Sequence, residues 1–309
     1  MNFTHNNHLT YSIGNRIFGT RENPYEKYKV NVGRIDLAYY KKSNWLQEQY
    51  RIADLVYQEL GKDVIVMVSG GTDSEIVLRA FRHIGIKPRG VFVKFANDYN
   101  IEELAAAQCI ADDIGINLEI IEFDVVDFYK SGQAHSLAAS VQCSKIAYLT
   151  VYHHILKLQA PTVMGGAMIL RRHVFPEGRK WYYDFSEDTD AGSIRLSLNN
   201  NIPIVQEWFA YTPEAMGYYL DDPTIQWLIT ERLNYKLFSE NVKNEILWRF
   251  MPTLIKKNKK HGYEKLSGLM SEAYKSMING YVNRLEYSLD GIFVDELRNQ
   301  LFGDNNAGC

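Results

Sequence analysis

The stretch from Asp63 to Leu78, DVIVMVSGGTDSEIVL, constrains the fold of this chain more than any other. It opens with an apolar run, Val64–Val68, that is short and rich in β-branched residues, as is typical of a strand buried on both faces. The run stops at SGGTDS, residues 69–74, and from Ile76 onward apolar residues recur at helical spacing. A strand, a glycine turn and a helix in this order direct backbone N–H groups at an anion.

The residue types of the turn suit a polyphosphate. Gly70 and Gly71 lack a Cβ atom, so the backbone can take a positive φ and approach a bound oxygen closely. Hydroxyl donors are supplied by Ser69, Thr72 and Ser74. Asp73 beside an anion site indicates a cation, since Mg²⁺ is commonly held by a carboxylate and phosphate oxygens together. The alternative is a glycine turn that only joins a strand to a helix. The Walker pattern G-x-x-x-x-G-K-[ST] is absent, and no G-x-G-x-x-G follows the strand.

The segment SGGTDS resembles the SGGxDS signature of the PP-loop, or N-type, ATP pyrophosphatases, within the adenine nucleotide α-hydrolase-like group. NAD synthetase, GMP synthetase and the C-terminal domain of asparagine synthetase are similar here, and the resemblance extends from about Asp63 to Arg172. It implies cleavage of ATP between the α- and β-phosphates with release of pyrophosphate. It also implies that residues 69–74 bind ATP and that Asp73 is catalytic and holds Mg²⁺.

The pattern after the turn predicts an α/β fold. Apolar strands at Gly90–Phe95 and Leu118–Phe123 alternate with helical segments, which indicates βαβ units and a doubly wound, mostly parallel sheet of the Rossmann-like type. In such sheets ligands bind at the carboxyl ends of the strands. We expect an N-terminal extension with a packing helix over residues 1–62 and a nucleotide-binding domain over 63–175. Residues 176–309 are expected to form a mainly helical substrate or lid region.

The end of the second strand, Lys94-Phe95-Ala96, should lie beside the signature turn. In the family that SGGTDS resembles, the corresponding strand end contacts adenine through its backbone, which assigns this role to Phe95 and Ala96. Lys94 either reaches a phosphate as a catalytic cation or is a surface lysine with a packed stem.

A second glycine pair follows a short predicted strand, where Gly165 and Gly166 would let the backbone approach the ligand. PP-loop synthetases often carry an acidic pair in the turn after this strand, and here the chain continues instead to Arg171 and Arg172. This departure speaks against an asparagine-synthetase-like assignment. The two arginines either contact pyrophosphate or the acceptor as catalytic cations, or form a surface pair.

Several further segments give expectations that the structure can test. One helix is predicted over Ser140–Leu158, with Cys143 either a buried structural thiol or a catalytic one. A long charged and aromatic loop is expected over Gly178–Asn201, and helical structure from Val205–Phe209 onward. The basic run Lys256–Lys260 is a solvated turn, a polyphosphate contact or a nucleic-acid contact.

Composition places the chain among soluble proteins. It has 309 residues, 46% of them hydrophobic and 23% charged, and a net charge of −3, which disfavours non-specific nucleic-acid binding by the whole protein. Three well-separated cysteines, including Cys309, favour a reducing compartment. No signal peptide and no apolar stretch of about 18 residues is recognised, so a cytoplasmic protein without a membrane partner is expected.

The leading hypothesis is an AMP-forming, ATP-dependent ligase or adenylyltransferase that acts on a small-molecule carboxylate or carbonyl acceptor, followed by amide or amine transfer. Asn2 stands where a class II glutaminase would need cysteine, so the amine donor would come from elsewhere; a homodimer is compatible with the sequence. The alternatives are a sulfonucleotide enzyme and a non-catalytic module that binds adenine nucleotides.

Overall fold

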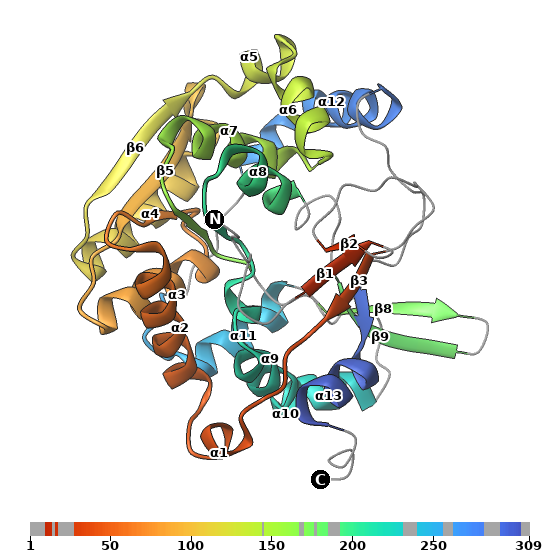
Figure 1. Cartoon of the computed structure of the whole chain (residues 1–309). Coiled ribbons are helices and arrows are strands. Elements are labelled where there is room, and N and C mark those ends of the chain that lie inside the picture. The colour runs from red at the N-terminus through yellow and green to blue at the C-terminus, as the bar shows by residue number, and fades with distance from the viewer. Residues whose placement is uncertain are drawn as a thin grey trace.

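The computed structural model describes residues 10–13, 16–17, 28–143, 145–166, 170–175, 178–184, 192–230, 240–255, 262–280 and 291–303. It contains a five-stranded parallel sheet in the order β10-β7-β4-β5-β6, of which Figure 1 labels β5 and β6. The strands are β4 (Ile65–Met67), β5 (Arg89–Phe95), β6 (Leu118–Phe123), β7 (Thr162–Met164) and β10 (Ile204–Val205). Because the strands alternate with helices that pack on both faces, the predicted doubly wound α/β fold is confirmed.

The two faces of the sheet carry separate hydrophobic clusters. Val66 packs into the cluster that contains residues of α2, α3 and α4, while its neighbours Ile65 and Met67 pack into the cluster that contains residues of α5, α6 and α7. Successive side chains of a strand point to opposite faces, so this short apolar run is buried on both sides. The helices concerned are α2 (Trp45–Leu60), α3 (Thr72–His83), α4 (Ile101–Ile114), α5 (Val125–Lys130), α6 (Gln133–Val141) and α7 (Ile146–Leu158).

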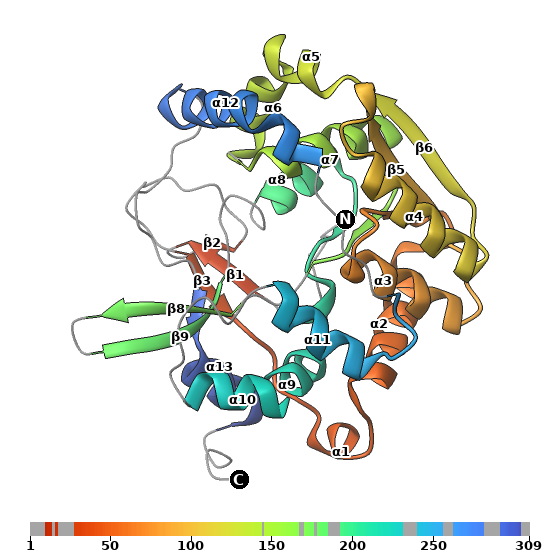
Figure 2. The ribbon, with the colours of Figure 1, turned by 180° about the vertical axis from the view of Figure 1, so that it is seen from behind.

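Two small antiparallel sheets accompany the parallel one. Their strands are β1 (Thr10–Ile13), β2 (Arg16–Ile17) and β3 (Tyr28–Asn31) in one, and β8 (Leu170–Phe175), β9 (Gly178–Asp184) and β11 (Gly291–Phe293) in the other. The β8–β9 hairpin projects away from the parallel sheet in both views (Figures 1 and 2).

The remaining elements are helical. They are α1 (Leu37–Tyr40), 3₁₀ helix η1 (Ala96–Asp98), α8 (Gly192–Asn200), η3 (Trp208–Ala210), α9 (Pro213–Leu220), α10 (Pro223–Thr230), α11 (Glu240–Phe250), η5 (Gly262–Leu266), α12 (Ser267–Gly280) and α13 (Val294–Phe302). Helix α12 lies with α5 and α6 at one end of the molecule, and α10 and α13 lie with α9 at the other (Figures 1 and 2). Within the described ranges, none of the helices has the length and hydropathy needed to cross a membrane.

Three expectations for secondary structure were wrong. The helix predicted over Ser140–Leu158 is broken, because Gln142 takes a left-handed conformation with φ of 51° and separates α6 from α7. Val205 is in a strand, because it pairs with Val163 and extends the parallel sheet. Residues 178–184 form β9, whose pairing with β8 and β11 supplies the hydrogen bonds that an isolated loop would lack.

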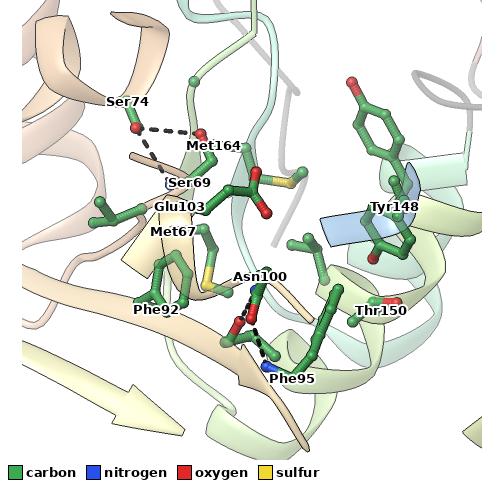
Figure 3. A pocket seen from close by; sticks show the side chains of 16 residues that line it. Met67, Ser69, Ser74, Phe92, Phe95, Asn100, Glu103, Tyr148, Thr150 and Met164 are labelled. Carbon is green, nitrogen blue, oxygen red and sulfur yellow. Dashed lines mark hydrogen bonds between the residues drawn. The ribbon is translucent and has the colours of Figure 1, made fainter. Parts of the chain in front are cut away.

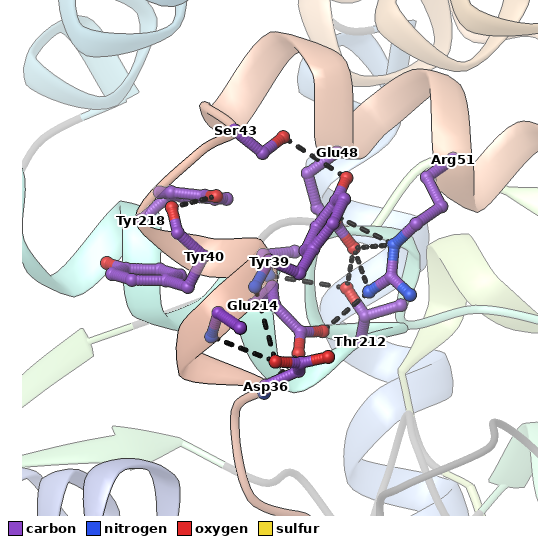
Figure 4. Close-up of polar contacts among 11 residues, drawn as sticks. Asp36, Tyr39, Tyr40, Ser43, Glu48, Arg51, Thr212, Glu214 and Tyr218 are labelled. Carbon is purple, nitrogen blue, oxygen red and sulfur yellow. Dashed lines mark hydrogen bonds and ion pairs between the residues drawn. The ribbon is translucent and has the colours of Figure 1, made fainter.

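A buried polar network joins α2 to the start of α9 (Figure 4). The carboxylate of Glu48, fully buried, accepts hydrogen bonds from the Thr212 hydroxyl and from the Arg51 guanidinium. Arg51 also contacts Glu214 Oε2 at 2.6 Å, and Glu214 Oε1 accepts a 2.8 Å hydrogen bond from the backbone N–H of Asp36. The network therefore links segments more than 150 residues apart in sequence (separations of 163 and 164).

Candidate active site

The signature turn lies between the carboxyl end of β4 and the start of α3. Ser74 Oγ donates a 3.0 Å hydrogen bond to Gly71 O and accepts one of 3.3 Å from Ser69 N–H. Ser69 Oγ accepts a 3.3 Å hydrogen bond from Gly71 N–H. Helix α3 begins at Thr72 after Gly71, and no side chain caps its N-terminus among the described residues. The first N–H groups of this helix are thus presented at the carboxyl edge of the sheet, where an anion would be favoured.

Two glycines allow the close packing on which this turn depends. Gly70 has φ of 69°, and a Cβ there would lie 2.5 Å from the carbonyl oxygen of Glu103 on α4. A Cβ on Gly165, at the end of β7, would lie 2.8 Å from the backbone N of Ser74. Both positions therefore require glycine for steric reasons, and Gly165 of the second glycine pair packs directly against the start of α3.

A cavity of about 410 Å³ opens beside the turn (Figure 3). Ser69 and Ser74 line it on the side of the turn, and the carboxylate of Glu103 points into it. Its apolar part is formed by Met67, Val68, Phe92, Val93, Phe95, Val151 and Met164, and further polar groups come from Asn100, Tyr148, Thr150 and Tyr263. A volume of this size, with a mainly apolar lining and a few convergent polar groups, is typical of a small-molecule site.

The Asn100 side chain occupies the open edge of β5 beside this cavity. Its Oδ1 accepts a 2.8 Å hydrogen bond from Phe95 N–H, and its Nδ2 donates a 2.8 Å hydrogen bond to Val93 O. Of these two backbone groups, Phe95 N–H belongs to a residue for which an adenine contact was expected. Phe95 lines the cavity with its ring, while Ala96 begins η1. The adenine-binding role of Phe95 and Ala96 stays a prediction, and it requires a base to replace Asn100 or to bind beside it.

Lys94 points toward the neighbouring strand. Its Nζ lies 3.0 Å from Glu122 Oε1 on β6 and 3.3 Å from Asp98 Oδ1, and Lys94 does not line the cavity. Hydrogen bonds to Glu122 and Asp98 raise the pKa of Lys94. The structure therefore does not bring Lys94 together with the signature turn, and a phosphate contact would require both ion pairs to break.

Asp73 stands at the start of α3 and is paired with a lysine from the C-terminal half of the chain. Lys243 Nζ on α11 lies 2.9 Å from Asp73 Oδ2 and 3.1 Å from Oδ1. The Asp73 and Lys243 side chains are 23% and 18% exposed, so the pair is partly accessible to solvent. A cation thus lies at the phosphate end of the candidate site, supplied by an element that sequence reasoning did not select.

Helix α11 is fixed near the site by a second ion pair. Arg249 Nη2 lies 2.9 Å and 3.0 Å from the two carboxylate oxygens of Asp222. Tyr219 is buried nearby, and its hydroxyl has no hydrogen-bond partner among the described residues. Burial raises the pKa of Tyr219, and the negative charges of Asp73 and Asp222 act in the same direction. The neutral hydroxyl is therefore the stable form of this side chain at neutral pH.

Other predicted residues cannot be placed in the site. Arg171 and Arg172 are in β8, but their side chains lie outside the described part of the molecule. Lys256–Lys260 and Cys309 lie outside the described residues altogether. Cys143 is buried, and a Cβ on Gly192 would lie 3.0 Å from its Cβ, which fits a structural thiol.

Sequence reasoning missed Asn100, Glu103, Tyr148, Tyr263 and Lys243. Asn100 and Glu103 carry a weak signal, since they follow closely the strand end that was expected to face the ligand. Lys243 carries none, because a lysine within a polar helix resembles a solvated residue until the fold places it beside Asp73.

Comparison with known proteins gives only distant structural similarity. No family model and no curated protein matches the chain. A predicted subunit of tRNA methyltransferase from Methanocaldococcus jannaschii aligns with TM-score 0.36 and 16% identity, over 75% of this chain and 96% of that one. NMN synthetase from Francisella tularensis aligns with TM-score 0.31 and 13% identity, over 81% and 98%. The NH3-dependent NAD synthetase from Campylobacter jejuni aligns with TM-score 0.32 and 12% identity, over 71% and 100%. At these TM-scores the similarities carry no weight for function, which has to be inferred from the site.

Proposed function

We propose that this protein binds ATP with its phosphates at residues 69–74 and transfers the adenylyl group to a carboxylate or carbonyl oxygen of a small-molecule acceptor. The observation that supports this most is the position of the SGGTDS turn. The start of α3, which no side chain of a described residue caps, lies at the carboxyl edge of a parallel sheet, directly beside a cavity of about 410 Å³.

The reaction needs positioning and charge neutralisation more than acid–base chemistry. An acceptor oxygen attacks the α-phosphorus, the bond from that phosphorus to the bridging oxygen breaks, and pyrophosphate leaves. The N–H groups at the start of α3 and the Lys243 ammonium would hold the polyphosphate. A carboxylate acceptor is already anionic, so no residue has to remove a proton from it. An amine donor would then attack the adenylate, giving an amide and AMP.

Mg²⁺ fits the residues at this position. Asp73 offers a partly exposed carboxylate beside the turn, and the described residues contain no group of three or more His, Cys, Asp or Glu side chains that could hold a metal alone. One carboxylate with phosphate oxygens and water is the arrangement that Mg²⁺ commonly takes. When bound, Mg²⁺ would neutralise charge on the phosphates. Lys243 would have to leave Asp73 for a phosphate oxygen.

Product analysis tests the proposal. The protein is incubated with Mg²⁺, ATP labelled at the α-phosphate and pooled small-molecule carboxylates, and the products are separated. We expect labelled AMP or an adenylate, together with one pyrophosphate for each ATP consumed. Formation of ADP and inorganic phosphate by the purified protein would contradict cleavage at the α-phosphorus.

A second candidate function is nucleotide binding without turnover. The ion pair between Asp73 and Lys243 favours it, because this pair neutralises the carboxylate without any metal. Calorimetric titration with ATP separates the two candidates. Tight binding that is unchanged by EDTA, with no AMP formed in the presence of any acceptor pool, would favour the binding module. Binding that requires Mg²⁺ favours the enzyme.

A further inference from the structure

We propose that Glu103 recognises the ribose of the bound nucleotide, its carboxylate accepting hydrogen bonds from the 2′- and 3′-hydroxyl groups. The inference rests on the proposed function, since it assumes that a nucleotide occupies the cavity. It assigns Glu103 as the residue that distinguishes ribonucleotides from deoxyribonucleotides.

The position of Glu103 is central in the cavity. It is only 8% exposed, and Figure 3 shows its carboxylate pointing into the cavity, between Ser69 and Tyr148. Its backbone carbonyl packs against Gly70, where an added Cβ would lie 2.5 Å from the oxygen. Helix α4 therefore brings this carboxylate close to the phosphate-binding turn through a contact that only glycine permits.

The chemistry of the cavity determines which part of a ligand can face this carboxylate. An ionised carboxylate beside a phosphate would be repelled, so Glu103 has to face a group that donates hydrogen bonds. Phosphate, sugar and base follow one another in a nucleotide. With the phosphates at Ser69 and Ser74 and the base against Phe92 and Phe95, the sugar lies in between, next to Glu103. A ribose diol offers two adjacent donors, and a carboxylate is an acceptor with two oxygens.

Glu103 contacts η5, which contributes Tyr263 to the lining of the cavity. Its Oε2 accepts a 3.4 Å hydrogen bond from Gly262 N–H, and η5 packs so closely that a Cβ on Gly262 would lie 2.5 Å from Cβ of Asn100. Burial raises the pKa of Tyr263, and the negative charge of Glu103 acts in the same direction. A carboxylate has about four acceptor positions, and the bond to Gly262 uses one of them.

The test compares affinities for ATP, 2′-deoxyATP and 3′-deoxyATP by calorimetric titration with Mg²⁺ present. For the unmodified protein we expect each deoxynucleotide to bind about tenfold or more weakly than ATP, because each lacks one hydrogen bond to a charged group. In Glu103→Gln this ratio should fall to about threefold or less. The amide keeps the size of the side chain and an acceptor for Gly262, but it cannot accept from both hydroxyls. Glu102→Gln changes the exposed neighbour on the same helix and should leave the ratio unchanged.

Three outcomes would overturn the assignment, and they can be told apart. Equal affinities for the three nucleotides in the unmodified protein would refute ribose recognition but leave the proposed function intact. Failure of all three to bind would overturn both proposals. If Glu103→Gln weakens all three nucleotides equally, and EDTA abolishes the difference between variant and parent, Glu103 is a magnesium ligand instead. A thermal melt of each variant establishes that it is folded.

Discussion

At the scale of single residues, Asp73 and Lys243 must change partners when a nucleotide with its metal binds. Asp73→Asn should therefore reduce turnover at least about 100-fold, because an amide is a poor Mg²⁺ ligand. The free energy of unfolding should change by less than about 1 kcal/mol, since the ion pair is partly exposed. Single-turnover kinetics and urea denaturation measure the two effects.

The matched control for Asp73 is Asp98→Asn. Asp98 is a more exposed aspartate that also pairs with a lysine, Lys94, but does not line the cavity. Turnover in this control should equal that of the parent. Near-normal turnover in Asp73→Asn would refute the role given to Asp73, and so would equal losses in the two variants.

Asn100 lies where the base of the nucleotide is predicted to contact the backbone of β5. Asn100→Ala leaves Phe95 N–H and Val93 O without this buried side chain, which should cost about 1–3 kcal/mol of unfolding free energy. The same two groups then become available to adenine, whose edge offers an adjacent donor and acceptor, whereas guanine presents them in the reverse order. We therefore expect the preference for ATP over GTP to increase in the variant. An unchanged preference would place the base elsewhere.

The residues of the turn could be predicted most directly from the sequence. Residues 69–74 are contiguous and each suits the same ligand, so local chemistry alone points to them. Lys243 is 170 residues from Asp73, and no local pattern connects the two. Lys94 shows the opposite case, since its position at a strand end was predicted correctly while Glu122 on the next strand determines where its side chain lies.

At the scale of elements, α7 carries a buried histidine that should make stability depend on pH. Burial lowers the pKa of His154 to about 4, and the positive charges of His153 and Lys157 act in the same direction. In the unfolded chain the pKa of His154 is near 6.5, so the unfolded state binds more protons than the folded state between pH 4 and pH 6.5. The stabilising contribution is therefore complete above about pH 6.5 and is lost as the pH falls toward 4.

This contribution can be measured with His154→Leu. Over the interval from pH 6.5 to 4, the parent should lose about 2 to 3 kcal/mol more of unfolding free energy than the variant. Urea denaturation at a series of pH values gives both curves. Parallel curves would show that His154 is not the titrating group.

Periodicity predicted most of the elements but not the way they are divided. The strands and helices from β4 to β6 follow from the switch between strand and helix spacing. The break at Gln142 does not, because nothing in the local composition requires a left-handed residue there. Strand β10 is two residues long and exists because β7 offers an open edge, which is information from the tertiary structure.

At the scale of the whole molecule, we expect the network around Glu48 to couple the unfolding of the segments that it joins, α2 and the start of α9. Glu48→Ala would remove the buried acceptor of Thr212 and one of the two carboxylates that contact Arg51, which should cost about 1–3 kcal/mol. Asp54→Ala, which removes an exposed carboxylate from the same helix, should cost less than about 0.5 kcal/mol. Circular dichroism and tyrosine fluorescence should report one coincident transition in the parent protein. Two separated transitions, or equal losses in the two variants, would contradict this role.

The domain boundary expected between residues 175 and 176 stays a prediction. The parallel sheet includes β10, which lies on the C-terminal side of that boundary. A sequence pattern identifies segments that can each form a strand or helix, whereas pairing across such a boundary depends on which edges remain open. The sequence of the turn does not indicate the acceptor, because the turn is proposed to bind the phosphates of ATP, which are the same for every acceptor.

The most direct test is a crystal structure of the protein soaked with Mg²⁺ and an ATP analogue whose α- and β-phosphates are joined by a methylene group. We expect the phosphates to lie against the backbone N–H groups of residues 69–74, with the base in the cavity lined by Phe92 and Phe95. We also expect Lys243 to have moved from Asp73 to a phosphate oxygen. Density for the analogue elsewhere on the molecule, with this turn empty, would contradict these expectations.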